Sequence, residues 1–209
     1  MLDTKKVKGL LMAPTQTFRA SKGDSLGHAF RYYTILLVIW AVLAAIVAMT
    51  MGVFAFNDAM IRLGNMGILG NLLAKSLADF GGFIATVNLF IVYVIFLVAL
   101  VGVFIKGFLW HVFVVLFGGM KDIEQTIKTT MYAMTPVLLL GWIPVIAIIG
   151  VIWGLALLIL GLTEMQEMEM GKAILVVVVP LVLLLILAIL GSAVIAALMA
   201  GFMGMLPGF

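Results

Sequence analysis

Two ionisable side chains, Lys106 and His111, interrupt an otherwise uncharged stretch that runs from residue 83 to residue 117. A charged or titratable group inside a long apolar segment is costly, and such residues often mark a functional site. An anion contact or a pH-sensing role would suit these two residue types. Five positions separate them, so on a helix their side chains point about 140° apart. The alternative interpretation is interfacial: Lys106 extends its amine to the lipid headgroups, and Trp110 marks the headgroup belt.

The other polar residues of the apolar stretches offer little reactive chemistry. Asn88 could form a hydrogen bond across helices as part of their packing. We find no carboxylate within an expected span core, no cysteine and only two histidines. None of the four serines has a histidine and a carboxylate in its sequence context. We therefore expect no enzymatic activity, no cofactor and no metal site.

Composition indicates the environment of the chain. Hydrophobic residues make up 66% of the 209 positions and charged residues 10%, whereas soluble domains are about half apolar and about a quarter charged. The mean hydropathy is +1.34. Several uncharged runs exceed the roughly 20 residues that cross a bilayer core. We predict an all-α, polytopic helical membrane protein whose first partner is the lipid bilayer. The net charge of +3 lies mostly near the N-terminus, where it indicates topology and not a nucleic-acid partner.

The apolar runs predict about five transmembrane helices after a polar arm. Residues 1–29 form this arm, in which Val7, Leu10 and Leu11 have the spacing of a short interfacial helix. Residues 30–209 form one membrane domain. The expected spans are 30–56, 83–106 with an extension to 117, 131–146, 148–162 and 172–205. A hairpin over 131–162 is favoured over one kinked helix because Gly141 and Pro144 lie in its middle.

Basic residues predict the orientation. With five spans, the arm and the loops at 120–130 and 163–172 share one side and carry most of the lysines, while Arg62 and Lys75 lie opposite. Lysine and arginine favour the cytoplasmic side. We therefore expect a multi-pass plasma-membrane protein with its N-terminus in the cytoplasm and its C-terminus outside. With four spans, the 163–172 loop would lie outside instead.

Several motifs follow the order and spacing of one known family. Residues 118–126 read Gly-Gly-Met-Lys-Asp-Ile-Glu-Gln-Thr, and 132–136 read Tyr-Ala-Met-Thr-Pro. They resemble the Gly-Gly-Lys-x-x-x-x-Gln loop and the Gly-Tyr-x-x-x-Pro span opening of the Yip domain family, with Met131 where that family often has glycine. Residues 171–173, Gly-Lys-Ala, are similar to the opening of its fifth span. Residues 14–18, Pro-x-x-x-Phe, are similar to its segment ahead of the first span.

The resemblance implies five helical spans and a cytoplasmic N-terminus. Eukaryotic members are Golgi and endoplasmic-reticulum proteins that associate with Rab-type GTPases in vesicle traffic. Their long soluble N-terminal region has no counterpart here, so GTPase binding is not carried over, and the short arm resembles that of prokaryotic members. The matching motifs add further candidate functional residues to Lys106, His111 and Asn88: Gly118, Gly119, Lys121, Tyr132 and Pro136.

Two functional hypotheses follow. The first is a non-enzymatic protein of the Yip type that organises or scaffolds membranes, with a cytoplasmic protein or a second copy of the chain as partner. The second is a small transporter or channel for an ion or small solute, which requires a water-accessible cavity near Asn88, Lys106 or His111. The Gly150-x-x-x-Gly154 pattern allows close helix packing, either within the monomer or between copies.

Overall fold

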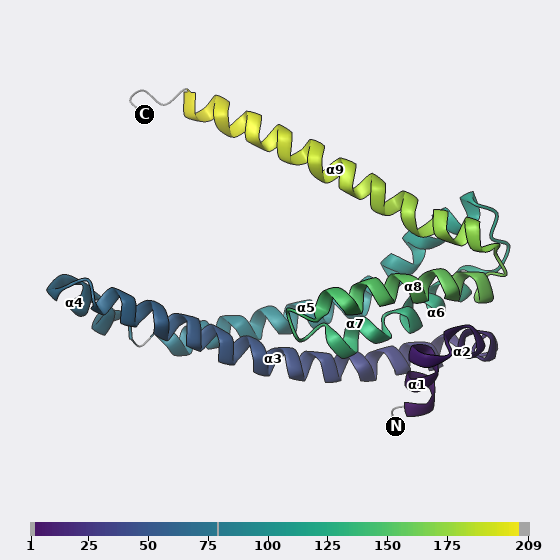
Figure 1. The fold of residues 1–209 in the computed structure, drawn as a ribbon, viewed down its shortest axis with the longest axis horizontal. Helices are drawn as coiled ribbons and strands as arrows, with labels where there is room; N and C mark the ends of the chain where they lie inside the picture. The colour runs from purple at the N-terminus through teal and green to yellow at the C-terminus, as the bar shows by residue number, and fades with distance from the viewer. Residues whose placement is uncertain (1–2, 79, 205–209) are drawn as a thin grey trace.

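The computed structural model describes residues 3–78 and 80–204, which form α-helices joined by short turns (Figure 1). No strand occurs within these ranges, and the prediction of an all-helical protein is confirmed. The helices, in chain order, are α1 (Thr4–Met12), α2 (Pro14–Ala20), α3 (Leu26–Gly64), α4 (Ile68–Leu77), α5 (Phe80–Leu116), α6 (Ile123–Ala133), α7 (Thr135–Leu140), α8 (Ala147–Met165) and α9 (Met170–Gly204).

Helices α3 and α5 form a long antiparallel pair. Helix α4 lies at the end of this pair that is distant from α1 and α2, where it packs against α3 (Figure 1). Helices α3 and α5 contain 39 and 37 residues, which gives lengths of about 55 to 60 Å at 1.5 Å per residue. Both exceed a bilayer core of about 30 Å. Helix α5 continues through Lys106 to Leu116, so the apolar residues after Lys106 extend the helix and do not form a separate segment.

The region 131–162 is interrupted twice. Helix α6 gives way to α7 at Met134, and a turn containing Gly141 and Pro144 separates α7 from α8. Helix α8 packs against both α6 and α7. This region is therefore a helical hairpin whose first half consists of the end of α6 and the short helix α7.

Two glycines of α8 permit the close packing of this hairpin. A Cβ atom at Gly150 would lie 2.8 Å from the carbonyl oxygen of Pro136, and one at Gly154 would lie 2.9 Å from Cγ2 of Val137. Both distances are too short for a larger residue without movement of the neighbour. The Gly-x-x-x-Gly pattern thus serves packing within the chain.

Helix α9 diverges from the rest of the molecule (Figure 1). It packs against α8 and α5 near its start, where Ala173, Val176 and Val177 are buried. From Leu181 to Phe202 every residue is exposed, and most of them are apolar. Such a surface is stable only in lipid or against another protein.

In the described part of the chain, four helices are long and apolar enough to cross a membrane: α3, α5, α8 and α9 as far as Phe202. The remaining expected span, 131–146, consists of the end of α6, the six-residue α7 and a turn. No single helix of membrane length occupies it, so the fifth span stays a prediction.

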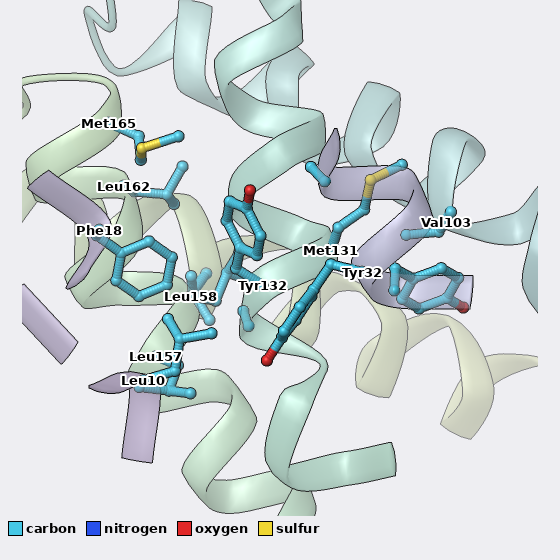
Figure 2. Close-up of a cluster of buried hydrophobic side chains, with 14 of the residues drawn as sticks. Leu10, Phe18, Tyr32, Val103, Met131, Tyr132, Leu157, Leu158, Leu162 and Met165 are labelled. Carbon is cyan, nitrogen blue, oxygen red and sulfur yellow. The ribbon is translucent and has the colours of Figure 1, made fainter. Parts of the chain in front are cut away.

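The buried core gathers at the end of the molecule where the arm meets the membrane helices. Helix α1 is capped by Asp3, whose carboxylate accepts from the Lys6 backbone amide at 2.9 Å. It packs against α2 and α7, and α2 packs against α8. Leu10 and Phe18 of the arm are fully buried in this core, and Figure 2 shows Phe18 beside Tyr132 and leucines of α8.

Candidate functional site: a buried polar cluster under the arm

Tyr132 anchors the arm through its hydroxyl. The side chain is fully buried, and its hydroxyl donates to Oδ2 of Asp24 at 2.5 Å. Lys6 pairs with the same carboxylate, donates to the Tyr132 hydroxyl at 3.2 Å, and places its amine 4.7 Å from the centre of the Tyr132 ring. Two residues of the arm thus converge on one tyrosine of α6.

The Asp24 carboxyl is held in its charged form. Burial opposes its ionisation and is the largest single influence, but the hydrogen bonds from Lys6 and Tyr132 and the charge of Lys6 together outweigh it. The pKa of Asp24 therefore lies below its usual range. The carboxylate is an anchor for the arm at neutral pH and not a reservoir of exchangeable protons.

Aromatic contacts fix the ring of Tyr132. Phe18 meets it edge-on at 6.5 Å between centroids, and Tyr32 of α3 does so at 5.4 Å. The Tyr32 hydroxyl lies 3.0 Å from Oγ1 of Thr135. Edge-to-face pairs of this kind add to the stability gained by burial. The arm, α3 and α6 therefore share one aromatic centre.

Lys128 fastens the turn that joins α2 to α3. Its side chain is only 2% exposed, and its amine donates to the carbonyl oxygens of Lys22 and Asp24 at 3.1 and 2.7 Å. Glu124, one helical turn earlier, lies 3.6 Å from the same amine. A buried ammonium group requires such partners because its desolvation is costly. Lys128 and Tyr132 are four residues apart and so hold the turn from one face of α6.

A second set of hydrogen bonds joins α5, α6 and the end of α8. Nδ1 of His111 lies 2.9 Å from Oγ1 of Thr126. Thr126 accepts from Nε2 of Gln166 at 2.8 Å, and the same nitrogen donates to the Asp122 carbonyl oxygen at 3.1 Å. Gln166 also accepts from the backbone amide of Lys121 at 3.1 Å. His111 is thus tied to the polar end of the protein.

Gly118 and Gly119 terminate α5. The amide of Gly119 donates to the Val114 carbonyl at 2.7 Å, and that of Gly118 donates to the Val115 carbonyl at 3.1 Å. Gly118 has a φ of +87°, the left-handed conformation that a glycine readily adopts at this position of a Schellman motif. A Cβ atom on Gly119 would collide with Val114. The positive φ at Gly118 and the close packing at Gly119 therefore account for a glycine at each position.

Lys121 and Lys22 share one exposed carboxylate, that of Glu167, near the end of α5. The Lys121 amine lies 2.9 Å from Oε2 of Glu167, while Lys22 of the arm lies 3.0 Å from Oε1. The hydrogen bonds from Lys121 and Lys22 and their charges lower the pKa of Glu167. Arg19 and Glu164 form a further two-pronged pair, with both distances 3.1 Å. Ion pairs thus bind the arm to the last turn of α8 and to the loop between α8 and α9.

The remaining candidate residues lie outside this cluster. Lys106 is exposed on α5 at the rim of an apolar slot. Asn88 packs against Gly52 of α3, where a Cβ atom would collide with its amide. Pro136 is buried in the first turn of α7, where a missing amide hydrogen is tolerated. Of the eight candidates, the structure therefore gathers His111, Gly118, Gly119, Lys121 and Tyr132 at one end.

Comparison with known families decides the affiliation of the chain. The Yip1 domain model matches residues 8–192. The chain belongs to the Yip1 domain family. No curated protein and no solved structure is found to match it. Among the residues that bind the arm to α6, only Lys6 precedes the Yip1 match. The resemblance seen in the sequence is confirmed, and the Gly-Gly and Tyr-x-x-x-Pro segments of this Yip1 domain end one helix and begin another.

Sequence reasoning missed four residues of the polar cluster: Lys6, Asp24, Lys128 and Gln166. Lys128 lies in a segment expected to be a polar loop or a short helix, and Gln166 lies in an expected polar loop, yet both are buried. One signal was available for Lys128: it lies four residues before Tyr132, on the same face of a helix. We define the polar cluster as these four residues with Tyr132, Thr126 and His111.

The chemistry that the polar cluster supports is attachment. Its donors and acceptors bind one another, and it joins segments from the arm, α6 and the α8–α9 loop. Within residues 3–78 and 80–204, no group of three or more potential metal ligands occurs. The cluster contains hydrogen-bond pairs and ion pairs, and Thr126, its one aliphatic hydroxyl, accepts from Gln166 and shares a hydrogen bond with His111.

Proposed function

We propose that this Yip1-family protein is a non-enzymatic membrane scaffold that presents one composite polar face to a cytoplasmic protein. The observation that carries the proposal is the attachment of the arm to α6 through the polar cluster and to the end of α8 and the α8–α9 loop through the ion pairs of Arg19 and Lys22. This attachment brings three separate segments onto one surface. The surface carries exposed charges of both signs, among them Lys5, Lys8, Lys121, Glu124 and Glu169.

Five membrane segments and a cytoplasmic N-terminus suit this proposal. Helices α3, α5, the α6–α7 pair, α8 and α9 alternate in direction (Figure 1), and this alternation supports the proposal of five successive crossings. In this topology, the arm, the 118–122 turn and the 166–169 turn share the cytoplasmic side. The excess of basic residues in these segments favours that side.

Single cysteines test the topology, because the chain has none of its own. We would place one at Lys8, Met120, Glu169 or Met66 and label intact cells with a membrane-impermeant maleimide. The expected result is labelling at Met66 alone, with the other three labelled only after permeabilisation. Labelling of Glu169 in intact cells would instead indicate four crossings.

Site-specific photocrosslinking tests the scaffold role. Met120 is 92% exposed at the polar end, and Met66 is 77% exposed at the opposite end, so a photoreactive amino acid at Met66 is a matched control. We expect a discrete protein adduct from Met120 and none from Met66. Asp24→Asn should weaken the adduct, because it loosens the arm. Equal adducts from both ends would contradict the proposal.

The transporter alternative makes an opposite prediction in proteoliposomes. Flux of ions and small solutes that is lost in Lys106→Ala or His111→Ala would establish a transporter and overturn the scaffold proposal. We expect no flux from folded protein. The polar groups around His111 bind one another, and the spaces beside α3 and α5 deeper in the membrane helices are lined mainly by apolar side chains.

A further inference from the structure

An apolar slot lies between α5 and α8. Both helices pack against α6, and the slot between them has a volume of about 290 Å³. An apolar cavity of about 150 Å³ already holds benzene, so this slot accommodates a length of hydrocarbon. Its lining residues are Lys106, Trp110, Thr130, Ala133, Met134, Val137, Val151, Gly154, Leu155 and Leu158.

Apart from the indole N–H of Trp110, only two side chains of the lining carry polar atoms. The Thr130 hydroxyl is already committed to the carbonyl oxygen of Thr126 at 2.9 Å. Lys106 is exposed, and none of the ion pairs within the described residues includes it. The slot therefore combines an apolar interior with one positive charge at its rim. A polar solute would find almost no partner inside it.

The position of Lys106 corresponds to the border between polar and apolar layers. It lines the slot together with Thr130 and Ala133, which flank Tyr132, and Tyr132 binds Asp24 of the polar arm. Trp110, one turn further along α5, lines the same slot, and tryptophan favours the headgroup level. An ammonium group at this depth is placed to meet a lipid phosphate.

The slot is open towards the space into which lipid would enter. Val151 and Lys106 on its two walls are exposed. Helix α9 covers the neighbouring end of the bundle only through Ala173, Val176 and Val177 and then diverges. The residues of α9 from Leu181 to Phe202 are exposed, and none of them lines the slot.

We propose that this slot is a binding site for an anionic phospholipid, with an acyl chain between α5 and α8 and the phosphate at Lys106. The choice of an anionic lipid follows from charge complementarity, because Lys106 has no carboxylate partner in the described residues. The site goes beyond the scaffold role and requires no protein partner. It can therefore be tested in lipid vesicles that contain no other protein, so the result does not depend on the scaffold proposal.

Fluorescence of Trp110 reports occupancy directly. The chain has four tryptophans, and replacing Trp40, Trp142 and Trp153 by phenylalanine leaves Trp110 as the only tryptophan, whose emission is excited selectively over that of the tyrosines. We would reconstitute this protein in phosphatidylcholine vesicles with increasing fractions of brominated phosphatidylglycerol or brominated phosphatidylcholine. One lysine near anionic lipid contributes about 1 kcal/mol, so we expect about fivefold preferential association of phosphatidylglycerol.

Charge and slot variants separate the two halves of the site. Lys106→Gln should reduce the preference to about one, while Lys75→Gln on α4 should leave it unchanged. Val151→Phe fills the slot and should reduce quenching by both lipids while thermal stability stays close to that of the parent. Equal quenching by both lipids in the parent protein, an unchanged preference in Lys106→Gln, or a Trp110 that neither lipid quenches would overturn the proposal.

Discussion

The hydroxyl of Tyr132 donates to the Asp24 carboxylate at 2.5 Å, although 108 positions separate the two residues. This bond joins the arm to the first half of the hairpin over 131–162. Lys6 strengthens the connection, because it pairs with the Asp24 carboxylate and donates to the Tyr132 hydroxyl. The arm is thus an integral part of the fold. Substitutions at Tyr132 and Lys128 measure how much this attachment contributes to stability.

Tyr132→Phe removes the hydroxyl and keeps the aromatic contacts with Phe18 and Tyr32. A hydrogen bond to a charged group contributes about 1.5 to 3 kcal/mol, and part of this is retained because Lys6 still pairs with Asp24. We therefore expect a loss of about 1 to 2 kcal/mol, measured by reversible unfolding in detergent. Tyr93→Phe, at an exposed position of α5, is the control and should cost nothing measurable.

Lys128→Met tests the buried ammonium group. The change keeps most of the side-chain volume but leaves the Lys22 and Asp24 carbonyl oxygens without their donor, which costs about 1 to 3 kcal/mol. We expect trypsin to cleave after Lys22 several times faster than in the parent protein. Lys75→Met removes a lysine that is exposed on α4 and should leave this cleavage rate unchanged. Equal rates in all three proteins would mean that Lys128 does not hold the turn.

The sequence predicted the long helices well because membrane-length helices depend on local composition. Helices α3, α5 and α9 each contain a long uncharged run, although α3 continues to Gly64, beyond the expected end of the first span at residue 56. A turn containing Gly141 and Pro144 lies before α8. The expected spans included no interruption at Met134, which lies two residues before Pro136. A proline in the first turn of a helix is compatible with either a new helix or a kink, so the residue alone did not decide.

The polar cluster could not be predicted from the sequence, for a physical reason. Apart from the Lys6–Asp24 and Lys128–Glu124 pairs, Lys6, Asp24, Lys128 and Gln166 find their partners 40 to 126 positions away, and no local pattern encodes such pairs. Tyr132 and Lys121 were found only through a family motif. The different helix faces expected for Lys106 and His111 agree with their different surroundings, since Lys106 borders the slot and His111 contacts Thr126.

Gly150→Ala and Gly191→Ala should shift stability in opposite directions. At Gly150 a methyl group would lie 2.8 Å from the backbone oxygen of Pro136, so α7 and α8 must separate, and overpacking costs about 1 to 3 kcal/mol. At Gly191 no atom lies within 4 Å of the new Cβ atom, and alanine favours the helix by about 0.5 to 1 kcal/mol. Thermal unfolding of both variants in one detergent measures the contrast. Destabilisation by both to the same extent would argue against close packing at Gly150.

The attachment of the arm should depend on pH through Asp24. Its folded-state pKa is depressed, so its contribution is complete above the unfolded value, which is about 3.9 for an aspartate. The contribution declines as the pH falls through the lower folded-state pKa, because protonation abolishes the pairing with Lys6. The expected result is a stability difference between the parent and Asp24→Asn that persists from pH 7 to about pH 5, where the charge of His28 also favours the carboxylate, and that shrinks at lower pH. Melting temperatures of both proteins across this range provide the measurement. Glu167 also has a depressed pKa, but both proteins contain it, so the difference between them isolates Asp24. A difference that grows on acidification would show that Asp24 is not held as a carboxylate by Lys6 and Tyr132.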